Sequence, residues 1–257
     1  MHSMDAWRTA IVQSDATHIW LRGYDVTSLM QQCTFASIVF LLQQGRLPDP
    51  REQRLLDAIL IAVSDHGAGA PSCAASRLVA SGNRGSLSAA IAAGVLAIGD
   101  EHGGAGEACM ELIAAVVQRS RRDGLTIAEA AARQVDESRA AGRRLPGFGH
   151  RVHTTDPRVD VLFTMAQEAG LAKDGVAAVR AIEVAVRERV KPLPLNIDGA
   201  MAALLFDLGF PSNAGKLMFI IGRVAGLAAE VAEEHAREKA MRIRIPVHYD
   251  GVPPREV

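Results

Sequence analysis

Three histidines of this 257-residue sequence, His66, His102 and His150, lie in glycine-rich breaks between apolar segments. Unpaired backbone groups at a helix end can hold such a histidine in one tautomer, which lets it polarise a carbonyl. Each one alone is more simply a surface or structural histidine, but the same placement in three loops favours a catalytic set. Asp198 follows a fourth break and precedes an apolar helix. As an N-cap it would be structural, whereas in an apolar pocket it would be a strong base toward a carbon acid.

Arginines extend this candidate site. Arg223 lies inside an apolar stretch, residues 219–227, so we expect it to be buried or to face a cleft, with a carboxylate partner. Arg158 follows Asp156-Pro157, and Arg244 lies near the C-terminus. The sequence contains no phosphate-binding GxxxxGK[ST], no dinucleotide-binding GxGxxG after a strand and no GxSxG motif. Histidine, aspartate and arginine together therefore indicate acid–base chemistry on a small carboxylate-bearing substrate.

The composition excludes several other classes. A net charge of -1 and an aromatic content of 4% argue against binding of nucleic acid. The sequence has no run of about 18 consecutive apolar residues, so it predicts no transmembrane helix. The start of the chain lacks the charged region followed by an apolar region that is typical of a secretory signal. We therefore expect a cytoplasmic protein. The three cysteines form no CxxC pair, and His150 and His153 have no accompanying ligand motif. We therefore expect reduced thiols and no metal site.

Most of the chain is predicted to be helical, because apolar residues recur at spacings of three and four. The segments with this pattern are 55–63, 89–98, 107–117, 176–190 and 217–232. Pro50, Gly124 and Asn213 mark expected helix boundaries. No useful apolar alternation precedes the C-terminus, where residues 243–249 are compatible with an extended tail. The candidate residues therefore lie mainly in loops at helix ends.

One stretch, PGFGHRVHTTDPR at residues 146–158, strongly resembles the citrate synthase family. Further motifs of that family occur in the same order: RGYD at 22–25, SDHG at 64–67, EHGGA at 101–105, LNIDG at 195–199, LGFP at 208–211 and GRVAG at 222–226. The chain is shorter than an ordinary citrate synthase. Its DHG and LNIDG segments look more like citryl-CoA lyase and the lyase module of ATP-citrate lyase.

The resemblance implies an all-α, citrate synthase-like homodimer in which a smaller mobile helical domain closes over a large one. By the matching motifs, the small domain comprises residues 103–210. The large domain is discontinuous, with residues 1–102 as its first part and residues 211–257 as its second part and C-terminal tail. Closure would assemble the site and exclude water.

The resemblance also implies roles for the candidate residues. In the condensing direction Asp198 removes a methyl proton from acetyl-CoA, His102 stabilises the enolate oxygen, and His150 donates to the carbonyl of oxaloacetate. In the cleaving direction each role reverses. Substrate carboxylates would be bound by His66, Arg158, Arg223 and Arg244, the last reaching the neighbouring subunit's site. Candidates for contact with coenzyme A are Arg143, Arg144, Gly147 and Gly149.

We therefore expect an enzyme, a citryl-CoA lyase that cleaves citryl-CoA to acetyl-CoA and oxaloacetate. Its substrate is a coenzyme A thioester, it needs no tightly bound cofactor, and a separate citryl-CoA synthetase would supply citryl-CoA. The same residues would serve a short citrate synthase, or a 2-methylcitrate synthase-like enzyme, that condenses an acyl-CoA with oxaloacetate and so produces citrate or its homologue. A third interpretation is a non-catalytic subunit that binds coenzyme A or a carboxylate. The combination of His66, His102, His150 and Asp198 argues against that one.

Overall fold

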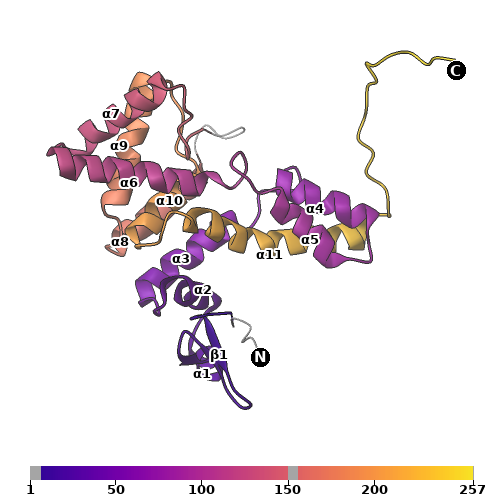
Figure 1. The fold of residues 1–257 in the computed structure, drawn as a ribbon, viewed down its shortest axis with the longest axis horizontal. Helices are drawn as coiled ribbons and strands as arrows, with labels where there is room; N and C mark the ends of the chain where they lie inside the picture. The colour runs from indigo at the N-terminus through magenta and orange to yellow at the C-terminus, as the bar shows by residue number, and fades with distance from the viewer. Residues whose placement is uncertain (1–6, 150–155, 257) are drawn as a thin grey trace, which may run out of the picture.

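The computed structural model describes residues 7–149 and 156–256, which contain three short strands and eleven helices (Figure 1). The strands are β1 (Val12–Ser14), β2 (Ile19–Leu21) and β3 (Tyr24–Asp25). The helices are α1 (Val26–Gln32), α2 (Phe35–Gln44), α3 (Pro50–Val63), α4 (Pro71–Gly82), α5 (Leu87–Leu96), α6 (Ala105–Asp123), α7 (Ile127–Ala140), α8 (Pro157–Glu168), α9 (Asp174–Arg189), α10 (Ile197–Asp207) and α11 (Ala214–Arg237). The prediction of an all-α protein is confirmed.

Helix α10 is the centre of the main core. It packs against α6, α8, α9 and α11, and it is apolar around nearly its whole circumference, as expected of a buried helix. Its buried residues are Ile197, Gly199, Ala200, Met201, Ala202, Ala203, Leu204 and Leu205. The same continuous core includes buried side chains of α2, α3, α6, α7, α8, α9 and the first half of α11. This packing fixes the start of α10, where Asp198 lies.

Helix α11 connects the two ends of the molecule. Figure 1 shows α6 to α10 gathered at one end and α4 and α5 at the other, with α11 running between them. Arg77 of α4 is ion-paired with Glu230, with Glu233 at 2.7 Å and with Glu234 at 3.1 Å, all on α11. Arg84 donates to the backbone carbonyls at the end of α11, including that of Glu234 at 3.2 Å. These contacts hold α4 and α5 against α11.

Local sequence signals set the predicted helix boundaries. Pro50 is the first residue of α3, where its missing N–H costs nothing, and Asp49 and Glu52 form a capping box around it. Gly124 ends α6 in the left-handed conformation, with φ of +64°. Asn213 is the N-cap of α11, but its side chain makes no capping hydrogen bond.

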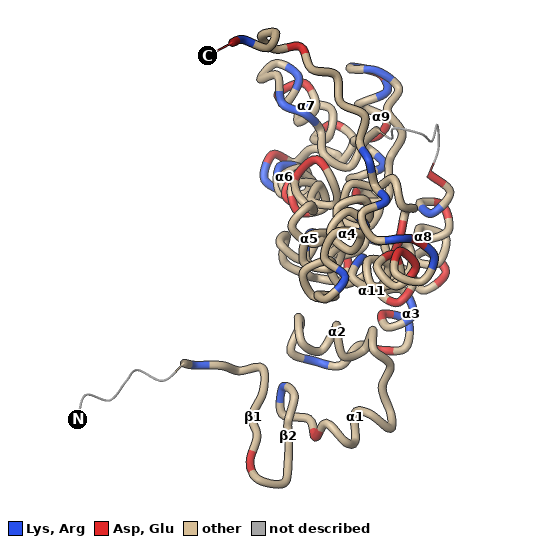
Figure 2. The backbone as a smooth tube through the Cα atoms, turned by 90° about the vertical axis from the view of Figure 1, so that its right-hand side faces the viewer, with Lys and Arg blue, Asp and Glu red and all other residues tan. Residues whose placement is uncertain are grey.

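A small antiparallel sheet, in the order β1-β2-β3, differs from the expectation that no strand precedes the C-terminal segment. Each strand has only two or three residues, too few for an alternating pattern to be recognised. The ring of Trp20 stacks on His18 with centroids 5.1 Å apart. Figure 2 shows this hairpin and α1 at the far end of the molecule from α6 and α7.

The C-terminal segment runs away from the helices as the predicted extended tail (Figure 1). Residues 244–256 are exposed and form no helix or strand. Arg242 still binds the body of the protein through Glu234, with Nη2 2.5 Å from Oε2. A separate finding concerns membranes: among the described residues, every helix is too short or too polar to cross a bilayer.

Candidate active site

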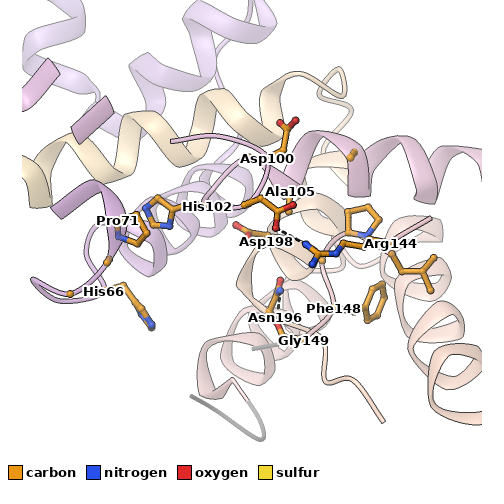
Figure 3. Close-up of a pocket in the computed structure, with 18 residues that line it drawn as sticks. His66, Pro71, Asp100, His102, Ala105, Arg144, Phe148, Gly149, Asn196 and Asp198 are labelled. Carbon is orange, nitrogen blue, oxygen red and sulfur yellow. Dashed lines mark hydrogen bonds and ion pairs between the residues drawn. The ribbon is translucent and has the colours of Figure 1, made fainter. Parts of the chain in front are cut away.

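A cavity of about 930 Å³ lies between the loops that precede α4, α6 and α10. Six of the predicted site residues line it, several of them drawn in Figure 3: His66, His102, Arg144, Gly147, Gly149 and Asp198. These residues are up to about 130 positions apart in the sequence, and the helix ends bring them together. The imidazole of His102 and the carboxyl group of Asp198 therefore line the same cavity.

His102 is held in one tautomer by Ser72. The backbone N–H of Ser72 donates to Nε2 of His102 at 3.2 Å, and the Ser72 hydroxyl lies 2.9 Å from the same nitrogen. Because an amide N–H can only donate, Nε2 accepts, and the ring is neutral with its proton on Nδ1. The amide belongs to the first turn of α4, where backbone N–H groups lack partners within the helix. His102 is therefore arranged as a hydrogen-bond donor through Nδ1.

Arg223 of α11 supports this arrangement through its contact with the Ser72 hydroxyl. It is only 2% exposed, and its Nη1 donates to the hydroxyl of Ser72 at 3.0 Å while its Nε donates to the Val63 carbonyl at 3.0 Å. The hydroxyl accepts from Arg223, so its own proton is directed to His102. The guanidinium also lies 4.8 Å from the centre of the Phe219 ring.

The predicted burial of Arg223 is confirmed, but the predicted carboxylate partner is wrong within the described residues. Its hydrogen bonds go to a carbonyl and a hydroxyl oxygen instead. Gly222 lets α11 lie close to the end of α3, because a Cβ at that position would lie 2.6 Å from Cγ2 of Val63 and 2.8 Å from the carbonyl oxygen of Leu60. Because α11 lies close to the end of α3, a backbone carbonyl accepts the hydrogen bond from Arg223 in place of the predicted carboxylate.

Asp198 is a buried carboxyl at the start of α10, and it is not the N-cap. Asn196 is the N-cap and accepts the N–H of Gly199 at 3.1 Å. The Oδ1 atom of Asp198 is buried without a hydrogen-bond partner among the described residues. Burial raises the pKa of Asp198 to about 6, although the charges of Arg158 and Arg223 oppose the increase. The geometry favours the acid–base interpretation of this residue over the capping one.

The loop before His150 lies directly against the start of α10. The carbonyl of Gly147 accepts the N–H of Asn196 at 3.1 Å, and the N–H of Gly149 donates to the Pro194 carbonyl at 2.8 Å. Gly147 has φ of +85°, and a Cβ there would lie 2.7 Å from the Cys109 sulfur. Only glycine permits both this conformation and this contact. Burial raises the pKa of the Cys109 thiol, in keeping with a packed, unreactive cysteine.

Arg158 is occupied by protein groups. Its Nε and Nη2 bind the two carboxylate oxygens of Asp156 at 2.9 and 2.7 Å, and its Nη1 donates to the Ala62 carbonyl at 2.9 Å. Arg158 and Asp156 line a second cavity of about 410 Å³, which shares His66 with the first. Among the described lining residues, His66 is the one that both cavities share.

The remaining predicted residues lie further from this centre. Arg144 is at the cavity mouth, where its Nη1 is 2.6 Å from Oε2 of Glu101, and both side chains are exposed. Arg143 is exposed and does not line the cavity, and Arg244 is exposed in the C-terminal tail. His150 lies outside the described residues, so its assignment stays a prediction.

Sequence reasoning missed Ser72, Asn196 and Asp156. A signal existed for the first two, because Ser72 follows a proline that begins a helix and Asn196 is a favoured capping residue two positions before the aspartate. The histidines considered as metal ligands include His150 and His153, both outside the described residues. Elsewhere in the described chain the oxygen and sulfur atoms of Asp65, Cys73 and Glu230 lie within 4.8 Å of one another. Arg77 neutralises Glu230 there.

The fold and the cavity define a class: an all-α protein in which a neutral imidazole and a buried carboxyl line one cavity and a buried arginine supports the imidazole through Ser72. The family can now be stated. The chain belongs to the citrate synthase family, since the family model for the citrate synthase C-terminal domain matches residues 46–244. The enzyme class inferred from the sequence, a carbon–carbon lyase or acyltransferase, is that of its relatives.

Among curated relatives, citrate synthase 1 of Mycobacterium tuberculosis (strain H37Rv) is 31% identical over 202 residues, which is 73% of this chain and 44% of that protein. The citrate/2-methylcitrate synthase of Bacillus subtilis (strain 168) is 27% identical over 221 residues, or 84% of this chain and 56% of that protein. The chain spans about half the length of the curated relatives it matches.

Among solved structures, the chain is similar to citryl-CoA lyase from Hydrogenobacter thermophilus, with a TM-score of 0.88 and 37% identity over 98% of this chain and 97% of that one. ATP citrate lyase from Methanothrix soehngenii, in complex with citrate and coenzyme A, gives a TM-score of 0.77 at 18% identity and covers 97% of this chain and 43% of that one. Citrate synthase from Thermotoga maritima gives 0.65 at 19%, over 99% and 96%. The citrate synthase-like fold is confirmed.

Proposed function

We propose that this protein is a citryl-CoA lyase, which cleaves citryl-CoA to acetyl-CoA and oxaloacetate. The observation that carries the proposal is the likeness to a citryl-CoA lyase over nearly the full length of both chains, at a TM-score of 0.88 and 37% identity. Citrate synthase from Thermotoga maritima, with similar coverage of both chains, reaches 0.65 and 19%. The comparison therefore favours the lyase over the synthase.

In the proposed cleavage, His150 accepts the proton of the citryl hydroxyl group. The carbon–carbon bond breaks as the oxaloacetate carbonyl forms, and the bonding pair becomes the enolate of acetyl-CoA. Nδ1–H of His102 stabilises the enolate oxygen, and the carboxylic acid of Asp198 gives its proton to the enolate carbon. The overall reaction consumes no water.

Two features of the site support these roles. Ser72 fixes the His102 ring so that Nδ1 carries the proton that the enolate oxygen needs. The pKa of Asp198, raised to about 6 by burial, leaves an appreciable protonated fraction near neutral pH. A carboxyl with this pKa can act as an acid in cleavage and as a base in condensation.

Binding roles follow the same assignment. His66 and Arg158 would bind the carboxylates of the four-carbon part, with Arg158 exchanging Asp156 for substrate. Arg223, which the sequence also predicted to bind a carboxylate, lines neither cavity and would act through Ser72 and His102. Contacts with coenzyme A would come from the cavity mouth and the adjoining turn, at Arg143, Arg144, Gly147 and Gly149. Residues 103–210 would close over residues 1–102 and 211–257. Gly103 and Gly209, with φ of +74° and +79°, form turns close to the two boundaries.

A homodimer is part of the proposal. Helix α5 carries no charged residue, and Figure 2 shows α4 and α5 almost free of charge on the face toward the viewer. Leu78 of α4 and Leu87 and Leu96 of α5 are exposed by 48%, 56% and 85%. Two copies that pack these faces would bury them and would let the tail carrying Arg244 reach the other copy. Leu96→Glu should convert a dimer to a monomer in light scattering coupled to size-exclusion chromatography.

The proposal has consequences for the cell. The proposed reaction cleaves citryl-CoA but does not form it from citrate. A separate citryl-CoA synthetase would therefore supply citryl-CoA. The proposed location is the cytoplasm.

A short citrate synthase, or a 2-methylcitrate synthase-like enzyme, is the second candidate. It is favoured by the 31% identity to citrate synthase 1 of M. tuberculosis and the likeness to the B. subtilis citrate/2-methylcitrate synthase. The same residues would act in reverse, and water would then hydrolyse the citryl thioester.

The test gives the purified protein citryl-CoA in one reaction and acetyl-CoA with oxaloacetate in another. Oxaloacetate is followed with malate dehydrogenase and NADH, and free coenzyme A with a thiol reagent. A lyase releases oxaloacetate from citryl-CoA without free thiol, whereas a synthase releases free thiol in the second reaction. An inactive wild type that still binds coenzyme A would instead indicate the non-catalytic subunit. Asp198→Ala is the control for contaminating activity.

A further inference from the structure

Asp65 directly precedes His66, which lines both cavities, and two hydrogen bonds hold its carboxylate. Its Oδ1 accepts the N–H of Gly67 at 2.5 Å, which closes a turn with His66 at its centre. Its Oδ2 accepts the S–H of Cys73, in the first turn of α4, at 3.5 Å. We infer that Asp65 is a positioning residue that fixes the His66 loop against α4 and so places His66 between the two cavities. This inference rests on the proposed function, in which His66 binds a carboxylate of the four-carbon part.

Two helices fix Asp65 from outside its own loop. Cys73 of α4 is fully buried, and burial together with the charge of Asp65 raises the pKa of its thiol, so the thiol stays protonated and can donate. Gly226 of α11 lies against the same loop. A Cβ at Gly226 would overlap the carbonyl oxygen of Ser64 and would lie 2.6 Å from Oδ2 of Asp65. Glycine therefore lets α11 approach the loop this closely.

The same two helices support His102, but through other residues. Ser72 of α4 contacts Nε2 of His102, and Arg223 of α11 donates to the Ser72 hydroxyl. Neither of these contacts involves Asp65. Loss of the Asp65 side chain should therefore displace His66 and leave His102 in place.

The charge of Asp65 gives the positioning role a distinct signature. Asp65 lines the second cavity together with Arg158, where the carboxylates of the four-carbon part would bind. A carboxylate at this position repels other carboxylates, so the charge of Asp65 alone weakens the binding of a dicarboxylate. Asparagine removes this charge but keeps an oxygen that can accept the N–H of Gly67. Alanine removes both the charge and the turn, so the two substitutions separate the two effects.

The experiment compares wild type with Asp65→Ala and Asp65→Asn. Isothermal titration calorimetry measures Kd for oxaloacetate and, separately, Kd for coenzyme A, and cleavage of citryl-CoA is measured as kcat and KM. Asp15→Ala is the matched control, because Asp15 forms the same kind of turn between β1 and β2, where its Oδ1 accepts the N–H of Thr17 at 2.8 Å. Cys73→Ala is a second test, since it removes the donor to Oδ2 and leaves the turn of Asp65 in place.

We expect Asp65→Ala to raise Kd for oxaloacetate at least about tenfold, because a hydrogen bond to a charged group becomes misaligned. Cys73→Ala should raise the same Kd by a smaller factor. Asp65→Asn should bind oxaloacetate at least as tightly as wild type, and Asp15→Ala should not change this Kd. Kd for coenzyme A should stay within about twofold of wild type in all variants.

An unchanged or lower Kd for oxaloacetate in Asp65→Ala, or an equal increase in Asp65→Asn, would overturn the positioning role. A parallel increase in Kd for coenzyme A would also overturn it, because the effect would then extend beyond the His66 loop. A wild type that binds oxaloacetate but does not cleave citryl-CoA overturns the lyase proposal, and the comparison of Kd values still tests Asp65. A wild type that does not bind oxaloacetate overturns both.

Discussion

Replacing Asp198 by asparagine should stabilise the folded protein at alkaline pH while it removes turnover. Burial raises the pKa of Asp198 from 3.8 to about 6. Between these values the folded protein holds a proton that the unfolded chain has lost, so the free energy of unfolding decreases as pH rises through this window and is constant above it. A shift of about two units corresponds to about 3 kcal/mol.

Asparagine carries no charge at any pH and has nearly the same size, so the substitution removes this penalty. The expected gain in the free energy of unfolding at pH 8 is up to about 3 kcal/mol, and it should be about half as large at pH 5, where part of the penalty is absent. Turnover should decrease by a factor of about 10² or more, as for the loss of a general acid–base group. Urea unfolding followed by circular dichroism at the two pH values measures the first effect.

Asp207, at the other end of the same helix, is the matched control. Burial raises the pKa of its carboxyl as well, but its oxygens accept the N–H groups of Lys173, Gly175 and Val176 at 2.8, 2.6 and 3.1 Å. An amide there leaves at least one of these donors unpaired, so Asp207→Asn should destabilise the protein by about 1–3 kcal/mol. Equal destabilisation by Asp198→Asn at both pH values would refute the claim that burial raises the pKa of this carboxyl.

Three further predictions concern turnover. Ser72→Ala removes the hydroxyl bound to His102 and Arg223 but keeps the backbone N–H, and it should lower kcat about tenfold with little change in KM; an unchanged kcat in steady-state assays would show that the hydroxyl does not contribute to the placement of His102. Because Asp198 acts as an acid in cleavage, kcat/KM for citryl-CoA should decrease as pH rises through about 6, whereas that for condensation should increase; a pH–rate series in both directions tests this. Glu101→Gln should free Arg144 and lower KM for the thioester, and Arg144→Gln should raise it, with kcat unchanged in both; equal KM values in both variants would contradict a contact between Arg144 and coenzyme A.

Much of the fold could be predicted because it depends on local patterns. The apolar spacing within residues 107–117 and 176–190 identifies α6 and α9, and Pro50 and Gly124 mark boundaries for steric reasons. The short strands β1 to β3 escaped prediction because two or three residues show no period. Their pairing depends on the register between neighbouring strands, and this register cannot be predicted from the sequence of any one strand.

The site shows a similar division. Glycine-rich loops at helix ends identified His102, and an isolated carboxylate before an apolar helix identified Asp198. The sequence could not decide which residue caps α10, because Asn196 and Asp198 both favour that position and only the path of the chain separates them. The partners of Arg223 were also beyond reach, since Ser72 lies 151 positions away and is brought close by α4 and α11 packing.

The direction of the reaction is the central claim, and the products of citryl-CoA test it most directly. The purified protein is mixed with citryl-CoA near neutral pH, and oxaloacetate, acetyl-CoA, citrate and free coenzyme A are quantified together over time. Oxaloacetate and acetyl-CoA in equal amounts, with citrate and free coenzyme A as minor products, is the result we predict. Citrate and free coenzyme A as the main products, formed by hydrolysis of the thioester, would contradict the lyase and favour a synthase.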